Sequence, residues 1–100
     1  MSWTLRIQPR ARLEMLEAAG WYATQSRMAS PRFMRALDAT LDRLRDNPLQ
    51  YQKVDDELRR ARVRGFMYSV VYAVVDDRIV IVGCVNTSRN PAHWRERKPE

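Results

Sequence analysis

The sequence has little of what metal sites and disulfide frameworks require. Its 100 residues include one cysteine and one histidine, and neither a CxxC nor an HExxH motif occurs. The single thiol, Cys84, has no partner for an internal disulfide, and it lies in an apolar run where a free cysteine usually packs as a small hydrophobic residue. We therefore expect no metal site, no cofactor, and a reducing, cytoplasmic setting.

Long apolar runs are also missing. No stretch of 18 apolar residues occurs, and residues 1–7 do not contain the apolar core of a signal peptide. The sequence therefore predicts no contact with a membrane. A length of 100 residues predicts a single domain, residues 1–100, with one modest hydrophobic core.

Basic residues outnumber acidic residues in the sequence. The chain carries 18 basic and 12 acidic residues, for a net charge of +6, and 16 of the basic residues are arginine. The planar guanidinium binds phosphates and carboxylates through two parallel hydrogen bonds and stacks on bases. This composition favours an anionic partner, such as nucleic acid, a nucleic-acid machine or an acidic protein. A high arginine content of the source genome is the alternative explanation.

Residues 59–86 predict a three-stranded antiparallel meander. They form three runs, 59–64, 67–75 and 79–85, which are separated by turn signals. The second run is rich in valine and tyrosine, and the third is almost wholly apolar, as expected for a central strand that is covered on both faces. The first run alternates, so its two faces differ: Ala61 and Val63 point one way, and Arg60, Arg62 and Arg64 point the other.

A short strand and an amphipathic helix are predicted before the meander. Residues 3–7 alternate apolar and polar side chains, and Pro9 suits the first turn of a helix that ends near residues 24–27. Gly20 weakens this helix by about 1 kcal/mol relative to alanine, which a close helix–helix approach would explain. The helix is expected to bury an apolar stripe made of Leu13, Leu16, Ala19 or Gly20, and Ala23.

A second helix follows. Ser30 is expected to be its N-cap, with Pro31 at the first helical position, and Asp46-Asn47-Pro48 is expected to end it. Its apolar stripe contains Phe33, Leu37, Leu41 and Leu44, with Ala36 and Thr40 beside them.

The two helices read as a hairpin that buries one face against the sheet. A short C-terminal helix is expected after Pro91, with Trp94 anchoring it on the core. The predicted order is therefore β-α-α-β-β-β followed by a short helix. The fold class is α+β, with a small antiparallel sheet packed against an N-terminal helical hairpin.

Three segments in this order resemble the ParE/RelE family, the toxins of bacterial type II toxin–antitoxin modules. They are residues 30–48, with their Ser-Pro start and Pro stop, residues 60–72, and residues 86–97. The last segment resembles the ParE-like ending His-x-Arg-Arg-Asp-Pro-x-x-Trp-x-x-Arg, which is typical of plasmid-stabilisation members. It departs from that ending at Asn86, Ser88 and Asn90, and it matches at Arg89, Pro91, Trp94 and Arg97.

The resemblance implies one of two activities. ParE-like members inhibit growth by binding and poisoning DNA gyrase, whereas RelE-like members are ribosome-dependent mRNA endonucleases. RelE-like chains often carry an arginine near the start of the strand that matches residues 67–75, where this chain has Met67-Tyr68-Ser69, and a histidine or tyrosine acid where it has Asn86. Because this chain lacks both of these nuclease residues at the matching positions, the sequence favours the non-enzymatic, ParE-like activity. If the chain is a nuclease, its candidate residues are Arg62, Arg64, Tyr68, Arg89 and His93.

The resemblance also implies a cognate antitoxin with an acidic, partly disordered segment that folds over the toxin. Trp21, Tyr22 and Tyr51 either supply apolar anchors for that segment or complete the core. The arginine row on the first meander strand is either a binding face or a solvated one. The candidates for binding the target or the antitoxin are Arg60, Arg62, Arg64, Arg89, Trp94 and Arg97.

Overall fold

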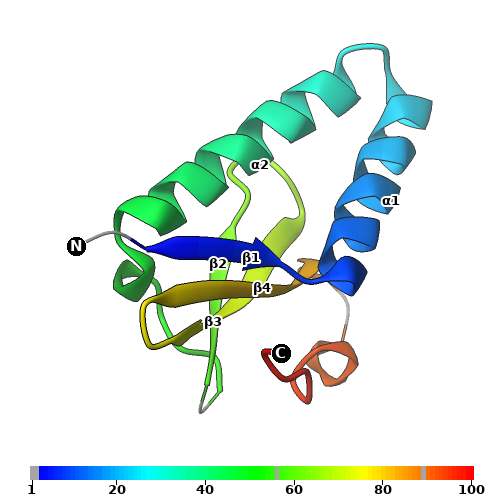
Figure 1. The fold of residues 1–100 in the computed structure, drawn as a ribbon. Helices are drawn as coiled ribbons and strands as arrows, with labels where there is room; N and C mark the ends of the chain where they lie inside the picture. Colours follow the sequence, from blue (N-terminus) through cyan, green and yellow to red (C-terminus); the bar gives the residue numbers. More distant parts are fainter. Residues whose placement is uncertain (1–2, 56, 89) are drawn as a thin grey trace.

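The computed structural model describes residues 3–55, 57–88 and 90–100. Its elements confirm the predicted order and the α+β class, although the predicted C-terminal helix is a single 3₁₀ turn (Figure 1). In chain order they are β1 (Thr4–Ile7), α1 (Pro9–Gln25), α2 (Ala29–Asp46), the 3₁₀ turn η1 (Pro48–Gln50), β2 (Leu58–Arg62), β3 (Tyr68–Val75), β4 (Arg78–Asn86) and the 3₁₀ turn η2 (Pro91–His93).

The four strands form one sheet in the order β1-β4-β3-β2. The meander β2-β3-β4 is antiparallel, and β4 lies inside the sheet, as predicted. β1 pairs with β4 in parallel, with Thr4 opposite Arg78 and Ile7 opposite Ile81. β1 therefore covers only the first part of β4.

The helical hairpin covers one face of the sheet (Figure 1). The predicted stripe of α2 is confirmed, because Phe33, Leu37, Leu41 and Leu44 are all buried. They pack with the side chains of β3 and β4 that point the same way, among them Tyr72, the largest of the fully buried side chains. Burial raises the pKa of Tyr72, whose hydroxyl donates a hydrogen bond of 2.6 Å to the Pro48 carbonyl.

The prediction for the buried face of α1 was wrong. Leu13 and Leu16 are 56% and 61% exposed, whereas the buried residues of α1 are Ala11, Met15 and Ala18, and Ala19 and Tyr22 pack against the core while partly exposed. The three buried residues recur at spacings of four and three, so they also form a helical face. The helix therefore turns its more apolar stripe away from the sheet.

The start of α2 also differs from the prediction. Its N-cap is Met28 rather than Ser30, and Ser30 and Pro31 lie in the first turn. The hydroxyl of Ser26 accepts a hydrogen bond of 3.1 Å from the Ala29 backbone N–H. Ser26 thus satisfies a backbone donor of the first turn that would otherwise lack a partner, and the helix begins at Ala29, before the predicted N-cap.

The second face of the sheet carries a smaller apolar cluster that includes Val71, Val82 and Val85. Trp94, which is only 3% exposed, belongs to it, as predicted for an anchor of the C-terminal segment. That segment lies on the side of the sheet away from α2 (orange to red in Figure 1). Within the described ranges, no helix is both long and apolar enough to cross a membrane.

Candidate functional site

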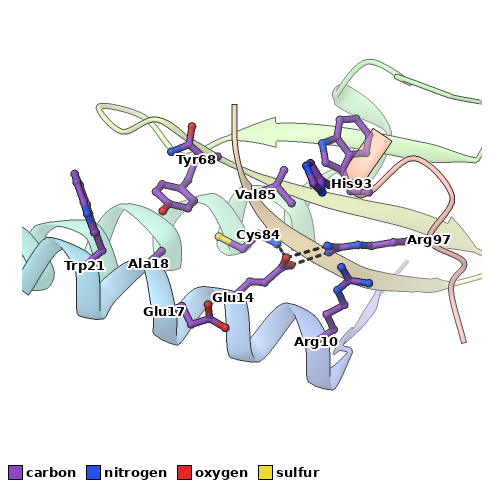
Figure 2. Close-up of a pocket in the computed structure, with 12 residues that line it drawn as sticks. Arg10, Glu14, Glu17, Ala18, Trp21, Tyr68, Cys84, Val85, His93 and Arg97 are labelled. Atoms are coloured by element: carbon purple, nitrogen blue, oxygen red, sulfur yellow. Dashed lines mark hydrogen bonds and ion pairs between the residues drawn. The ribbon is translucent and has the colours of Figure 1, made fainter. Parts of the chain in front are cut away.

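A cleft of about 380 Å³ opens between α1, the end of β4 and the C-terminal segment (Figure 2). Arg10, Glu14, Glu17 and Trp21 line it from α1, where their spacing places them along one side of the helix. The opposite wall consists of Tyr68, Cys84, Val85, Asn86, His93, Trp94 and Arg97. The cleft therefore joins segments from both ends of the chain.

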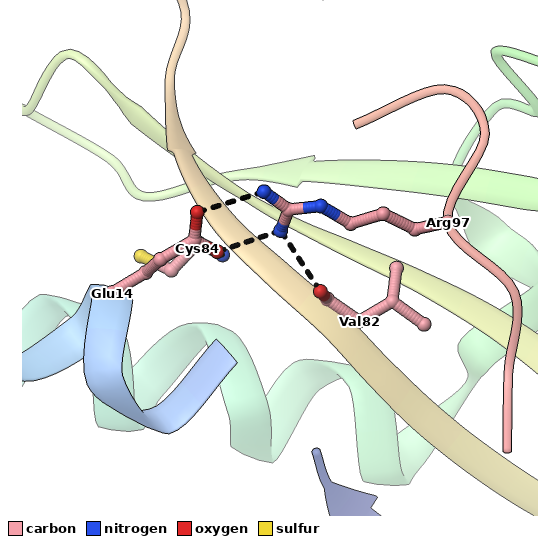
Figure 3. Close-up of polar contacts among 4 residues, drawn as sticks. All are labelled: Glu14, Val82, Cys84 and Arg97. Carbon is pink, nitrogen blue, oxygen red and sulfur yellow. Dashed lines mark hydrogen bonds and ion pairs between the residues drawn. The ribbon is translucent and has the colours of Figure 1, made fainter. Parts of the chain in front are cut away.

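Glu14 and Arg97, which both line the cleft, form an ion pair (Figure 3). Arg97 Nη1 donates to Glu14 Oε1 at 2.7 Å, and Nη2 donates to Oε2 at 2.9 Å. The Arg97 side chain is 9% exposed and the Glu14 side chain 23%. Such a bidentate, largely buried ion pair has a well-defined geometry, and its two charges attract each other more strongly than those of an exposed ion pair.

The same pair also bonds the backbone of β4 beyond the point where β1 ends. The Cys84 N–H donates to Glu14 Oε1 at 3.1 Å, and Arg97 Nη1 donates to the Val82 carbonyl at 3.0 Å. An irregularity in the β3–β4 pairing lies here, because Val71 is opposite Gly83 while Tyr72 is opposite Ile81. The two side chains therefore support a stretch of strand that β1 does not reach.

Gly83 makes room for this arrangement. A Cβ atom on Gly83 would overlap Arg97 Nη1 and would lie 3.3 Å from Glu14 Oε1. The guanidinium and the carboxylate thus rest directly on the strand backbone. A larger residue here would force the Arg97 guanidinium to shift.

Cys84 is not a reactive group of the cleft. Burial, and then the nearby Glu14 carboxylate, raise the pKa of the Cys84 thiol to about 12. The thiolate is the reactive form of cysteine, and at neutral pH this site holds very little of it. The sequence-based expectation that Cys84 packs as an apolar residue agrees with its 2% exposure.

Tyr68 and His93, the cleft residues that could transfer protons if the chain were a nuclease, are separated. Tyr68 lies toward the Trp21 end, whereas His93 lies beside Arg97 toward the Arg10 end, with Val85 between them (Figure 2). The Tyr68 ring packs edge-to-face against Tyr22 and Phe33.

The asparagines that depart from the family ending stabilise turns. Asn86 stands opposite Tyr68 in the sheet, and its Oδ1 accepts hydrogen bonds from the N–H and hydroxyl of Ser88 at 2.9 and 2.6 Å. Asn90 Oδ1 accepts from the Ala92 N–H at 3.0 Å at the start of η2. Both side chains therefore have a local structural role.

The predicted arginine row lies on the sheet face opposite the helices. Arg60 and Arg62 are exposed on β2, and Arg64 is exposed in the turn that follows. The side chains that alternate with them, Ala61 and Val63, are fully buried, as predicted. Arg62 Nε makes one long hydrogen bond, 3.4 Å, to the Phe66 carbonyl. This arrangement presents cations on the edge strand of the sheet.

The other predicted binding residues have different surroundings. Trp94 is buried against the second face of the sheet, and Arg97 is held by Glu14. Arg89 lies outside the described residues. Of the aromatic anchors, Tyr22 and Tyr51 pack against the core, while Trp21 is 53% exposed. A role for any of these residues in binding a partner remains a prediction.

Sequence reasoning missed Glu14, Arg10 and Glu17 as residues of the cleft. Glu14 and Arg97 are 83 positions apart, and no local pattern connects them. Within residues 3–55, 57–88 and 90–100, no three histidine, cysteine, aspartate or glutamate side chains gather in a way that could hold a metal ion.

The chain matches a known protein family. The family model described as the ParE toxin of the type II toxin–antitoxin system parDE matches residues 5–97. No curated protein matches the chain. The family match covers every helix and strand of the fold except the first residue of β1.

Proposed function

This chain belongs to the ParE family of toxins of type II toxin–antitoxin systems, and on that premise we propose that it arrests growth by binding DNA gyrase. Membership of the family implies a cognate antitoxin as its partner. In the proposal the toxin acts as a binding protein. It traps gyrase on DNA, and the antitoxin neutralises it.

The observation that carries this proposal is the arrangement of the cleft. General acid–base cleavage of RNA needs a base at the 2′-hydroxyl and an acid at the leaving oxygen, both within hydrogen-bond reach of one phosphate. Tyr68 and His93 lie toward opposite ends of the cleft, and the terminal nitrogens of Arg97 are bonded to Glu14 and Val82. The geometry therefore supports binding better than phosphodiester cleavage.

A binding surface of suitable charge lies elsewhere, at Arg60, Arg62 and Arg64. These three residues are exposed, and they stand on β2 and on the turn that follows it. A gyrase–DNA complex offers both phosphates and acidic side chains, which arginine binds well. We therefore assign the target contact to this arginine row.

The proposal predicts which substitutions abolish growth arrest after induced expression. Arg60→Glu combined with Arg62→Glu should restore growth, because two charges of the binding face are reversed. His93→Ala and Tyr68→Phe should each keep the arrest at wild-type strength. Growth rate after induction is the measurement, with circular dichroism of each purified variant as the control for folding. Arrest that survives the charge reversal and disappears with His93→Ala would refute the proposal.

One observation favours a second candidate, a ribosome-dependent RNA endonuclease. Tyr68 and His93 line the same cleft, together with the cations Arg10 and Arg97. A nuclease would produce new mRNA 5′ ends at codon-defined positions in a translating extract. The gyrase poison would leave the mRNA intact.

A further inference from the structure

The cleft carries side chains that the fold itself does not use. Within the part of the chain that the structure describes, the Arg10 guanidinium and the Glu17 carboxylate take part in no ion pair, although both line the cleft. Trp21 lines it as well, and this large aromatic residue is 53% exposed. A cation, an anion and an aromatic ring therefore remain available to a ligand.

These three side chains follow one another along the cleft side of α1. Figure 2 shows Arg10 toward one end, Trp21 at the other, and Glu17 between them. Glu17 follows Arg10 by seven positions, which is about 10 Å along a helix, and Trp21 follows Glu17 by four, which is about 6 Å. The first separation is close to the length of one nucleotide, from its phosphate to the far edge of its base.

We propose that the cleft binds one guanine nucleotide, with its phosphate at Arg10, the edge of its base at Glu17 and the plane of its base on Trp21. A guanidinium binds a phosphate through two parallel hydrogen bonds, and nucleic-acid bases stack well on exposed aromatic rings. The cleft volume of about 380 Å³ falls within the usual range of small-molecule sites. Glu14 does not repel the phosphate strongly, because Arg97 neutralises its charge.

Glu17 and Asn86 select guanine among the bases. The N1–H and N2–H groups of guanine are neighbouring donors, and the two oxygens of an ionised carboxylate accept both. Oδ1 of Asn86 accepts from Ser88, which leaves the NH₂ group of Asn86 as a donor for the adjacent guanine O6. Adenine would instead place the lone pair of its N1 against the Glu17 carboxylate, which is unfavourable.

Growth arrest and the arginine row on β2 play no part in this binding, so the nucleotide site is independent of gyrase as the target. Two sources offer the same ligand chemistry. One is a free guanine mononucleotide, and the other is an unpaired guanine within a single strand of nucleic acid. The experiment therefore includes a probe for each source.

Isothermal titration calorimetry of the full chain with guanosine monophosphate, adenosine monophosphate and guanosine tests the site. The guanine nucleotide should bind at least about tenfold more tightly than the adenine nucleotide, and Glu17→Gln should abolish this preference. Trp21→Ala should weaken the binding of both nucleotides by about tenfold or more. Arg10→Ala should raise the Kd for guanosine monophosphate by about tenfold and leave guanosine, which has no phosphate, within about threefold.

Arg12→Ala is the matched control for Arg10→Ala. Arg12 is exposed on the same helix but does not line the cleft, so its Kd for guanosine monophosphate should stay within about threefold of wild type. Circular dichroism shows whether each variant is folded.

Two single strands identify the source of the ligand. One is an oligothymidylate with a single central guanine, and the other is its all-thymine counterpart, which offers the same phosphates to the arginine row. Tighter binding of the guanine strand than of both the all-thymine strand and guanosine monophosphate assigns the cleft to a strand. Binding of the mononucleotide with no preference for the guanine strand assigns it to a free nucleotide.

Two results would overturn the inference. One is the absence of binding when the folded wild-type chain is titrated with guanosine monophosphate and the guanine strand at millimolar concentration. The other is binding that folded Arg10→Ala and Glu17→Gln variants each leave within about threefold of wild type, because the ligand would then occupy another surface. No gyrase is present in these titrations, so a failure of the proposed target would leave their result unchanged.

Discussion

Replacing Arg97 with leucine is expected to lower the free energy of unfolding by about 3 kcal/mol. The change removes three hydrogen bonds, two to the Glu14 carboxylate and one to the Val82 carbonyl. It leaves Glu14 charged, largely buried and without its guanidinium partner. Breaking a buried ion pair on one side costs more than the pair contributes, because the remaining charge is poorly solvated.

Urea denaturation measures this loss, and Arg95→Leu is its matched control. Arg95 is exposed and lies two positions away on the same segment, so its replacement should change the free energy of unfolding by less than about 0.5 kcal/mol. Tryptophan fluorescence of the chain should also shift to longer wavelength in the Arg97 variant, because the buried Trp94 becomes exposed as the C-terminal segment loosens. Equal stabilities of the two variants would contradict the role assigned to the ion pair.

Gly83→Ala is expected to destabilise the chain by about 2–3 kcal/mol. The added Cβ would overlap Arg97 Nη1, so the ion pair must move off β4 or the strand must bend. The cost is steric and depends on the guanidinium. In the Arg97→Leu background the same substitution should therefore cost less than about 1 kcal/mol, which a double-mutant cycle by urea denaturation would measure.

Gly20→Ala provides the contrasting control. Beyond its own helical turn, no atom of the described residues lies within 4 Å of its added Cβ, and alanine is the better helix former, so this variant should be more stable by about 0.5–1 kcal/mol. If Gly83→Ala cost the same with and without Arg97, the glycine would be required for a reason other than the ion pair.

The second helix and the central strands could be predicted from the sequence. In α2 the large residues Phe33, Leu37 and Leu44 recur at helical spacing, and no competing apolar stripe exists on its charged side. In β4 the run from Ile79 to Val85 is apolar at both alternating positions, so burial on both faces follows directly. Local pattern and tertiary packing agree in these elements.

The orientation of α1 could not be predicted in the same way. Its stripe with Leu13 and Leu16 is more apolar than the face that is buried, so periodicity selects the wrong side. The small side chains of Ala11 and Ala18 allow α1 to pack against β4, and Glu14 reaches the strand backbone from there. These are tertiary constraints, and the sequence near α1 contains no sign of them.

The candidate site was predicted only in part. The exposure of Arg60 and Arg62 follows from the alternation of the strand, because polar and apolar residues take opposite faces. The cleft depends on the pairing of Glu14 with Arg97, which brings the C-terminal segment back to the first helix. Such a contact between distant segments becomes visible only when the chain is folded.

Supercoiling of a relaxed plasmid by purified gyrase, with and without this chain, tests the central claim most directly. The proposal predicts that the toxin suppresses supercoiling, that linear DNA appears after protease treatment, and that added antitoxin reverses both effects. The Arg60→Glu, Arg62→Glu variant should leave supercoiling intact. Full supercoiling at saturating toxin, together with new mRNA 5′ ends in a translating extract, would contradict the gyrase assignment and favour the nuclease.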